Sequence, residues 1–87
     1  MKFNERLKEL RLSSSYLQKE LAAAINVSVR TFQNYEHGDA EPNIESLIKL
    51  ADIFHVTLDY LMGRDDNPSA EADAVELRTN PPVNPNV

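Results

Sequence analysis

The sequence contains no cysteine and no tryptophan, and it has only two glycines among its 87 residues. Without cysteine the chain forms neither disulfide bonds nor thiolate metal sites, so nothing in it indicates an oxidising compartment. Two glycines are too few for a glycine-rich phosphate-binding loop. No apolar run approaches membrane-spanning length, and the charged start MKFNERLKEL lacks the apolar stretch of a signal peptide. We therefore expect one small, cytoplasmic domain without a membrane partner.

The sequence also lacks a set of residues that would carry catalysis. Its two histidines, His37 and His55, fall on different predicted helices. Asp52 and His55 are three residues apart and could share a metal ion, but such a pair is more typical of a solvated helix face. We therefore expect no enzyme activity, no bound metal and no cofactor.

Charge is unevenly distributed along the chain, whose net charge is −5. Six basic and three acidic side chains give residues 1–35 a net charge of +3, whereas residues 36–63 carry −5 and residues 64–87 carry −3. A polyanion is attracted to a local positive surface whatever the sign of the total. The distribution therefore favours residues 1–35 as a nucleic-acid-facing side.

Apolar residues recur at helical spacing in five segments, which predicts an all-α fold. The predicted helices are residues 3–12, 17–25, 29–36, 44–54 and 57–62. Asn43 and Thr57 are expected to cap the fourth and fifth helices, and Gly63 to end the last one. The predicted core consists of Leu7, Leu10, Leu21, Ala22, Ile25, Phe32, Leu47, Leu50, Ala51, Phe54, Leu58 and Leu61.

The segment from Gln18 to Gly38 has the features of a helix-turn-helix. The break between its two helical patterns is only three residues long, too short for antiparallel packing, so the helices must cross steeply. Ala22 is small enough for a close crossing, and Asn26 tolerates the left-handed conformation that the turn requires. Ser28 is expected to cap the second helix of the motif, and Gly38 to follow its end.

Taken together, these residues resemble the phage-repressor and Cro type of helix-turn-helix protein, the Xre family. The resemblance covers about residues 4–63, and these residues carry it: Arg11, Leu17–Ala22, Asn26–Ser28, Phe32, Tyr35–Gly38, Pro42, Leu47, Leu50, Ala51, Val56–Asp59 and Leu61. It implies a five-helix, lambda-repressor-like domain that binds double-stranded operator DNA as a dimer, with its third helix in the major groove. By motif position, Arg11 and Glu36 would form an interior ion pair between the first and third helices.

The resemblance also implies which side chains meet DNA. The base-reading positions would be Val29, Arg30, Gln33 and Asn34, and the backbone-contacting positions Gln18, Lys19, Ser28 and Asn43. Arginine can bind the O6 and N7 atoms of guanine together, and asparagine or glutamine the N6 and N7 atoms of adenine.

The chain departs from the family pattern at four places. Asn26 stands where glycine is usual, and Val29 is apolar where a polar base-reading residue is common. Leu17 stands where a threonine or asparagine cap is usual, and Ser15 with Gln18 matches a capping box that would replace that cap. The loop Asp39–Glu41 is acidic where many relatives are basic, which would weaken phosphate contacts rather than alter the fold.

We expect two regions: a helix-turn-helix domain at residues 1–63 and an acidic, proline- and asparagine-rich disordered tail at residues 64–87. The predicted dimer interface comprises Ile48, Tyr60 and Met62, apolar residues that so small a core would leave uncovered. Three functions remain open. They are a DNA-binding repressor, a DNA-binding antitoxin whose tail binds a protein toxin, and a protein-interaction module that no longer binds DNA.

Overall fold

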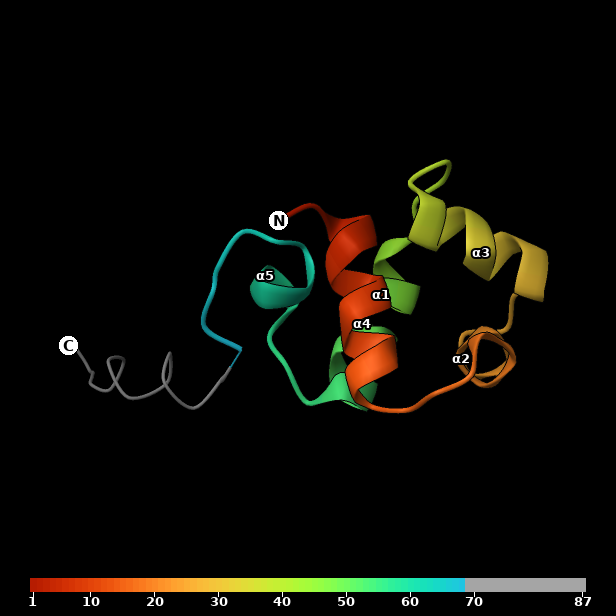
Figure 1. The fold of residues 1–87 in the computed structure, drawn as a ribbon, viewed down its shortest axis with the longest axis horizontal. Coiled ribbons are helices and arrows are strands. Elements are labelled where there is room, and N and C mark those ends of the chain that lie inside the picture. Colours follow the sequence, from red (N-terminus) through yellow and green to blue (C-terminus); the bar gives the residue numbers. More distant parts are fainter. Residues whose placement is uncertain (69–87) are drawn as a thin grey trace, which may run out of the picture.

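The structure, a computed structural model, describes residues 1–68 as five helices without a strand among them (Figure 1). The helices are α1 (Phe3–Ser13), α2 (Gln18–Ala24), α3 (Val29–His37), α4 (Ile44–Phe54) and α5 (Leu58–Leu61). Every helix end lies within one residue of the predicted position, and the all-α class is confirmed. None of these helices is long and apolar enough to cross a membrane.

Three helices begin at the side-chain caps that the sequence predicts. The side-chain oxygens of Ser28, Asn43 and Thr57 accept hydrogen bonds from backbone N–H groups three residues later, at 3.0, 2.9 and 3.0 Å. Each bond satisfies a donor that has no partner within its helix. At the other end of α3, Gly38 adopts the expected left-handed conformation, with φ of 85°.

The prediction that Ser15 forms a capping box with Gln18 is wrong. The N-cap of α2 is Leu17, and the Glu20 carboxylate accepts the Leu17 N–H at 2.8 Å. Ser15 has a φ of 62° and lies in the loop before the helix. An acidic side chain at the third helical position therefore satisfies the exposed backbone donor, and it also lies favourably in the first turn of the helix dipole.

The crossing of α2 and α3 forms as the small residue and the turn predict. Ala22 is almost fully buried, and its carbonyl accepts the Val27 N–H at 2.9 Å. Asn26 has a φ of 60°, the left-handed conformation expected of it. Figure 1 shows α2 almost end-on while α3 runs across the view, so the two helices cross at a steep angle. This geometry leaves one side of α3 free of α2.

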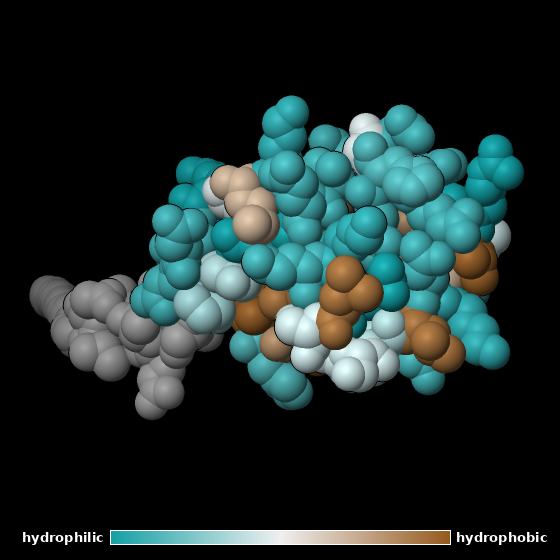
Figure 2. Space-filling model, viewed as in Figure 1, coloured by the Kyte–Doolittle hydropathy of each residue, from teal (hydrophilic) through white to brown (hydrophobic). Residues whose placement is uncertain are grey.

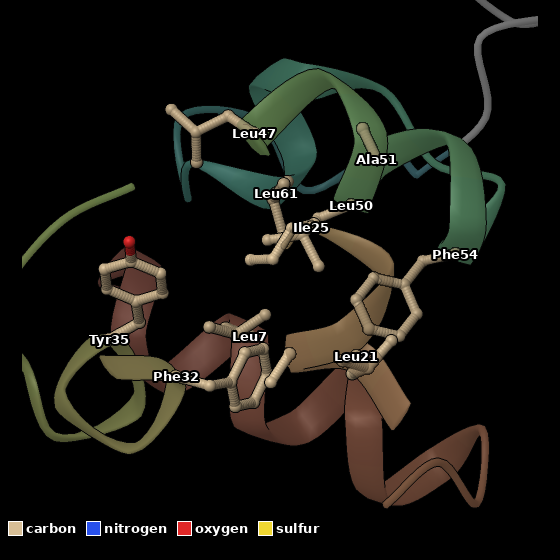
Figure 3. Close-up of a cluster of buried hydrophobic side chains, with 11 residues drawn as sticks. Leu7, Leu21, Ile25, Phe32, Tyr35, Leu47, Leu50, Ala51, Phe54 and Leu61 are labelled. Atoms are coloured by element: carbon tan, nitrogen blue, oxygen red, sulfur yellow. The ribbon is translucent and has the colours of Figure 1, made fainter. Parts of the chain in front are cut away.

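The core draws on all five helices. Its buried members are Leu7, Leu21, Ala22, Ile25, Phe32, Tyr35, Leu47, Leu50, Ala51, Phe54 and Leu61. Figure 3 shows these side chains converging from the surrounding helices. The predicted core members Leu10 and Leu58 lie at its edge, partly buried. Phe32 is fully buried and contacts Tyr35 edge to face, with ring centroids 6.4 Å apart, which fastens α3 to the core.

Arg6 corrects our interpretation of the charge pattern. We counted it among the basic residues available to a polyanion, but it is only 4% exposed. Its guanidinium lies 3.7 Å from the centre of the Tyr60 ring and donates to the Tyr60 carbonyl at 2.8 Å. It also lies 3.5 Å from Glu9 and 3.8 Å from Asp66. Arg6 therefore joins α1 to α5 and adds no positive charge to the outer surface.

After Gly63 the chain stays in contact with the helical domain. The Arg64 N–H donates to the Asp59 carbonyl at 2.8 Å, and the Thr57 N–H donates to the Pro68 carbonyl at 3.2 Å. The boundary at residue 63 stays a prediction, and Arg64 and Pro68 make backbone contacts with α5 and its N-cap residue. The rest of the predicted tail lies outside the described residues.

Substitution at the two glycines should have unequal effects on stability. Both have positive φ, 85° at Gly38 and 80° at Gly63, so alanine at either should cost about 1–2 kcal/mol in backbone strain. A Cβ at Gly38 would meet only the flexible Asn4 side chain at 3.4 Å, whereas one at Gly63 would lie 1.9 Å from the Met1 carbonyl oxygen. In thermal unfolding, Gly63→Ala should therefore destabilise the protein more than Gly38→Ala. Equal decreases in the melting temperature of the two variants would show that Met1 moves away from a Cβ at residue 63 without cost.

Candidate nucleic-acid interface

The candidate interface is the side of α3 that faces away from the core. Val29, Arg30, Gln33 and Asn34 recur at helical spacing on this side, while Phe32, Tyr35 and Glu36 on the opposite side are buried. Val29 is 40% exposed, Arg30 is exposed, and Gln33 and Asn34 are half-buried. In Figure 2 the surface in the region of α3 is mostly hydrophilic. The four predicted base-reading residues therefore share one accessible helix face.

Two cations lie at this side without internal partners. Arg30 in the first turn of α3 and Lys19 in the first turn of α2 are exposed, and neither is ion-paired within residues 1–68. An unpaired surface cation can neutralise a phosphate of a nucleic acid and so release the counterions condensed on it. The acidic loop residues Asp39 and Glu41 are also exposed, after the far end of α3. Positive charge therefore lies at the beginning of α3 rather than at its end.

The two predicted backbone-contacting caps differ in their free hydrogen-bonding groups. The Ser28 hydroxyl accepts from the Thr31 N–H and lies 3.0 Å from the Thr31 hydroxyl, so both of its contacts are within α3. Asn43 uses its Oδ1 atom to cap α4, and its Nδ2 donors make no hydrogen bond within the described part of the chain. Asn43 therefore keeps a donor that the described residues do not use.

Behind the interface, the ion pair that the sequence predicts joins α1 to α3. Arg11 Nε lies 2.6 Å from Glu36 Oε2, and Arg11 Nη2 donates to Glu36 Oε1 at 3.2 Å. The Arg11 side chain is 12% exposed and that of Glu36 is 2% exposed. The guanidinium also donates to the Tyr16 carbonyl at 3.3 Å. Two parallel hydrogen bonds give this pair a fixed geometry.

Gln18 links this ion pair to the exposed face of α3. Its Nε2 donates to Glu36 Oε1 at 2.9 Å, and its Oε1 accepts from Gln33 Nε2 at 3.2 Å. The sequence predicted an outward contact for Gln18 but neither of these internal bonds. One N–H of the Gln18 amide and its backbone N–H, at the start of α2, make no hydrogen bond within residues 1–68.

The residues of the predicted dimer interface lie on α4, on α5 and at the C-cap of α5. Ile48 is on α4 and is 47% exposed, the greatest exposure of the three. Tyr60 is half-buried beneath the Arg6 guanidinium, and Met62 packs partly buried against the core. Ile44, one turn before Ile48 on α4, is 65% exposed and was not predicted as a contact residue. The interface stays a prediction, with Ile48 its most accessible member.

Within residues 1–68 no three histidine, aspartate or glutamate side chains are grouped closely enough to hold a metal ion. His55 instead ends α4 with a φ of 57°.

Comparison with known proteins places this geometry in a family. Residues 7–61 match the family described as "Helix-turn-helix". The chain is 38% identical over 66 residues to the HTH-type transcriptional regulator ImmR of Bacillus subtilis, covering 76% of this chain and 52% of ImmR. It is 36% identical over 64 residues to the cryptic phage CTXphi transcriptional repressor RstR of Vibrio cholerae, covering 74% of this chain and 57% of RstR. The chain thus spans between half and two thirds of the length of these relatives.

Two solved structures share the fold. A transcriptional regulator from Listeria innocua superposes with a TM-score of 0.71 and 31% identity, over 86% of this chain and 70% of that one. The P22 c2 repressor, solved in complex with a synthetic operator, superposes with a TM-score of 0.68 and 28% identity, over 75% of this chain and 98% of that one.

The five-helix arrangement is therefore a lambda-repressor-like fold, as the resemblance implied. The chain belongs to the helix-turn-helix family of the Xre type. This is a family of non-enzymatic DNA-binding regulators, in agreement with the expectation that the chain is no enzyme.

Proposed function

We propose that this protein is a cytoplasmic, sequence-specific DNA-binding transcriptional repressor that binds a palindromic or pseudopalindromic operator as a dimer. In this proposal α3 enters the major groove, residues 1–63 bind DNA, and the tail from residue 64 is a site for a possible protein partner. The observation that carries the proposal is the exposed face of α3, where Arg30, Gln33 and Asn34 lie together opposite a buried side.

The chemistry of that face suits base recognition. Arg30 is an unpaired guanidinium, which can bind both acceptors of guanine, and the two amides can bind adenine in the same bidentate way. Val29 offers an apolar contact to a thymine methyl group. Because the three polar side chains lie within two turns of one helix, they suit adjacent base pairs.

Helix ends and nearby polar groups supply the contacts to the DNA backbone in this proposal. α3 begins at the Ser28 cap, so the positive end of its dipole and its first backbone N–H groups lie beside Arg30. Lys19 and the free amide donors of Gln18 and Asn43 contribute from α2 and α4. Such contacts fix the position of the protein on the duplex, while the groove-facing side chains select the sequence.

Selection of binding sites from random duplexes, repeated over a salt series, tests the proposal. We expect an enriched palindromic or near-palindromic site whose retention decreases as salt rises, because each phosphate contact releases condensed counterions. No enrichment and no salt-dependent retention at any ionic strength would instead favour the protein-interaction module. Copurification of a small toxin with a protein that also passes this test would favour the antitoxin.

The dimer in this proposal should depend on Ile48 and not on Ile44. Two-fold related subunits would place equivalent contacts about 34–36 Å apart along the duplex. Ile48→Gln should lower the fraction of dimer in sedimentation on the selected site, because it replaces the most exposed apolar residue of the predicted interface. Ile44→Gln, a change of the same kind one turn away, is the matched control. A wild-type protein that sediments on the site as a monomer would refute the dimer.

A further inference from the structure

We propose that a cavity between the α2–α3 turn and the beginning of α4 binds a small carboxylate with an apolar body, and that this ligand releases the protein from DNA. The cavity has a volume of about 510 Å³, within the range of small-molecule sites. The release of DNA rests on the proposed function, because it concerns a residue that contacts the DNA backbone there. The binding of the ligand does not.

A buried hydroxyl without a partner lies at the wall of this cavity. Tyr35 lines the cavity and is only 8% exposed, and its hydroxyl makes no hydrogen bond within residues 1–68. In Figure 3 the hydroxyl points away from Phe32, toward the side of the core where Leu47 of α4 lies. A buried tyrosine hydroxyl normally has a partner, because leaving it unsatisfied costs free energy. A ligand with an acceptor atom would supply that partner.

Other groups of the wall also suit an anionic head group. The amide of Asn26, the Nδ2 donors of Asn43 and the hydroxyl of Ser46 belong to residues that line the cavity, and they have no hydrogen-bond partner among residues 1–68. Lys49 adds an ammonium group that is not ion-paired there. The 11-residue helix α4 begins after Asn43, so the positive end of its dipole lies at the same wall. These groups match a carboxylate, whose oxygens only accept hydrogen bonds.

The apolar part of the wall determines the rest of the ligand. Ile25, Val27 and Ile48 line the cavity, and a hydrocarbon body would remove their surface from water. This favours an organic carboxylate over an inorganic anion. Glu45 is the only carboxylate among the described residues of the lining, and it would attract an ammonium group on the ligand. The ligand class therefore includes apolar amino acids as well as plain carboxylic acids.

An occupied cavity would oppose DNA binding through Asn43. In the proposed complex with DNA, the free Nδ2 donors of Asn43 meet a phosphate, and Asn43 also lines the cavity. A carboxylate bound there would take such a donor and place negative charge beside the first turn of α4. Phosphate and ligand therefore compete, and each lowers the affinity of the protein for the other by the same factor.

The first test is a titration of the free protein, followed by the NMR signals of its backbone amides. The probes are 4-methylpentanoate, L-leucine, which adds an ammonium group to it, and 3-methylbutylamine, which is leucine without its carboxylate. Both carboxylates should give saturable shifts at Asn26, Tyr35 and Ser46, and the amine should not. Tyr35 also borders a second cavity, between α1 and the end of α3. Shifts at Asn4 and Gly38 alone, an equal response to the amine, or no saturable shift would overturn the proposal.

The two carboxylates distinguish the two sources of the ligand. Tighter binding of L-leucine would identify an amino acid, and Glu45→Gln should then remove the advantage of L-leucine over 4-methylpentanoate. Tighter binding of 4-methylpentanoate would identify a plain carboxylic acid, and Glu45→Gln should then strengthen its binding, because a like charge is removed from the wall. Either result supports a carboxylate site.

Removing single donors tests the assigned contacts. Tyr35→Phe keeps the ring in the core and should raise the dissociation constant of the carboxylate about two- to tenfold, as expected for one lost hydrogen bond. Asn26→Gly should also weaken binding, and glycine tolerates the φ of 60° at this position. Tyr16→Phe is the matched control, because Tyr16 packs against Phe54 and does not line the cavity. A Tyr35→Phe protein that binds the carboxylate as tightly as Tyr16→Phe would contradict the assignment.

Competition on the selected operator tests the release of DNA. The tighter carboxylate should displace the wild-type protein from the operator, and Tyr35→Phe should need about two- to tenfold more of it. Without ligand, Tyr35→Phe and the wild-type protein should bind the operator equally. If the carboxylate binds the free protein but leaves operator occupancy unchanged, the release of DNA is wrong. If the free protein binds the carboxylate but no DNA, the proposed function fails and the assignment of the cavity is supported.

Discussion

Replacing Glu36 by glutamine should lower the free energy of unfolding by about 3–5 kcal/mol, the range for breaking a buried ion pair from one side. The wild-type carboxylate receives two hydrogen bonds from Arg11 and one from Gln18, and its side chain is 2% exposed. Glutamine at this position keeps one acceptor and turns the other into a donor that faces donors. The Arg11 guanidinium, 12% exposed, would then stay charged and poorly compensated. Urea denaturation measures the change directly.

Two further variants determine whether the missing charge partner causes that loss. Replacing both Arg11 and Glu36 by methionine removes the uncompensated charge, so the double variant should be more stable than Glu36→Gln. Glu45→Gln changes an exposed carboxylate in the first turn of α4 that forms no ion pair within residues 1–68. It should cost no more than about 1 kcal/mol, the range for a carboxylate at the positive end of a helix dipole. A Glu36→Gln protein as stable as Glu45→Gln would contradict the buried pair.

The fold could be predicted from the sequence because its signals are local. Helical spacing, the caps at Ser28, Asn43 and Thr57, and the turn at Asn26 each depend on a few neighbouring residues. The cap of α2 was predicted wrongly because two pairs of residues compete for that role. Ser15 with Gln18 and Leu17 with Glu20 both have the capping-box spacing, and the residues alone do not show which of the two begins the helix.

The polar interior was harder to predict because its contacts join distant parts of the chain. Arg6 looks like a surface charge in α1 until Tyr60, more than fifty residues later, brings an aromatic ring beneath it. Gln18 likewise looks like an outward residue of α2 until α3 places Glu36 and Gln33 on either side of it. A pattern within one helix shows which face is apolar, but it does not identify the partner of a buried polar group.

Arg30→Ala should weaken binding to the selected operator by roughly 1–3 kcal/mol and relax preference at one base pair, as expected for a lost bidentate contact to guanine. Arg30 is exposed in the first turn of α3, and no side chain among residues 1–68 pairs with it, so its removal leaves the core and the ion pair behind α3 unaltered. Unfolding curves of the variant and the wild-type protein should therefore coincide, which separates a binding defect from a folding defect.

Lys19→Ala is the matched control, because it removes an exposed cation from the first turn of the neighbouring helix α2. As a phosphate contact, Lys19 should strengthen binding to every sequence alike, so its loss should weaken operator and scrambled duplex equally and lower the salt slope by about one unit. Arg30→Ala should instead reduce the ratio between the two duplexes. Both variants are measured on both duplexes over one salt series. If Arg30→Ala weakens the two duplexes equally, Arg30 contacts phosphate, and base recognition by α3 must depend on Gln33, Asn34 and Val29.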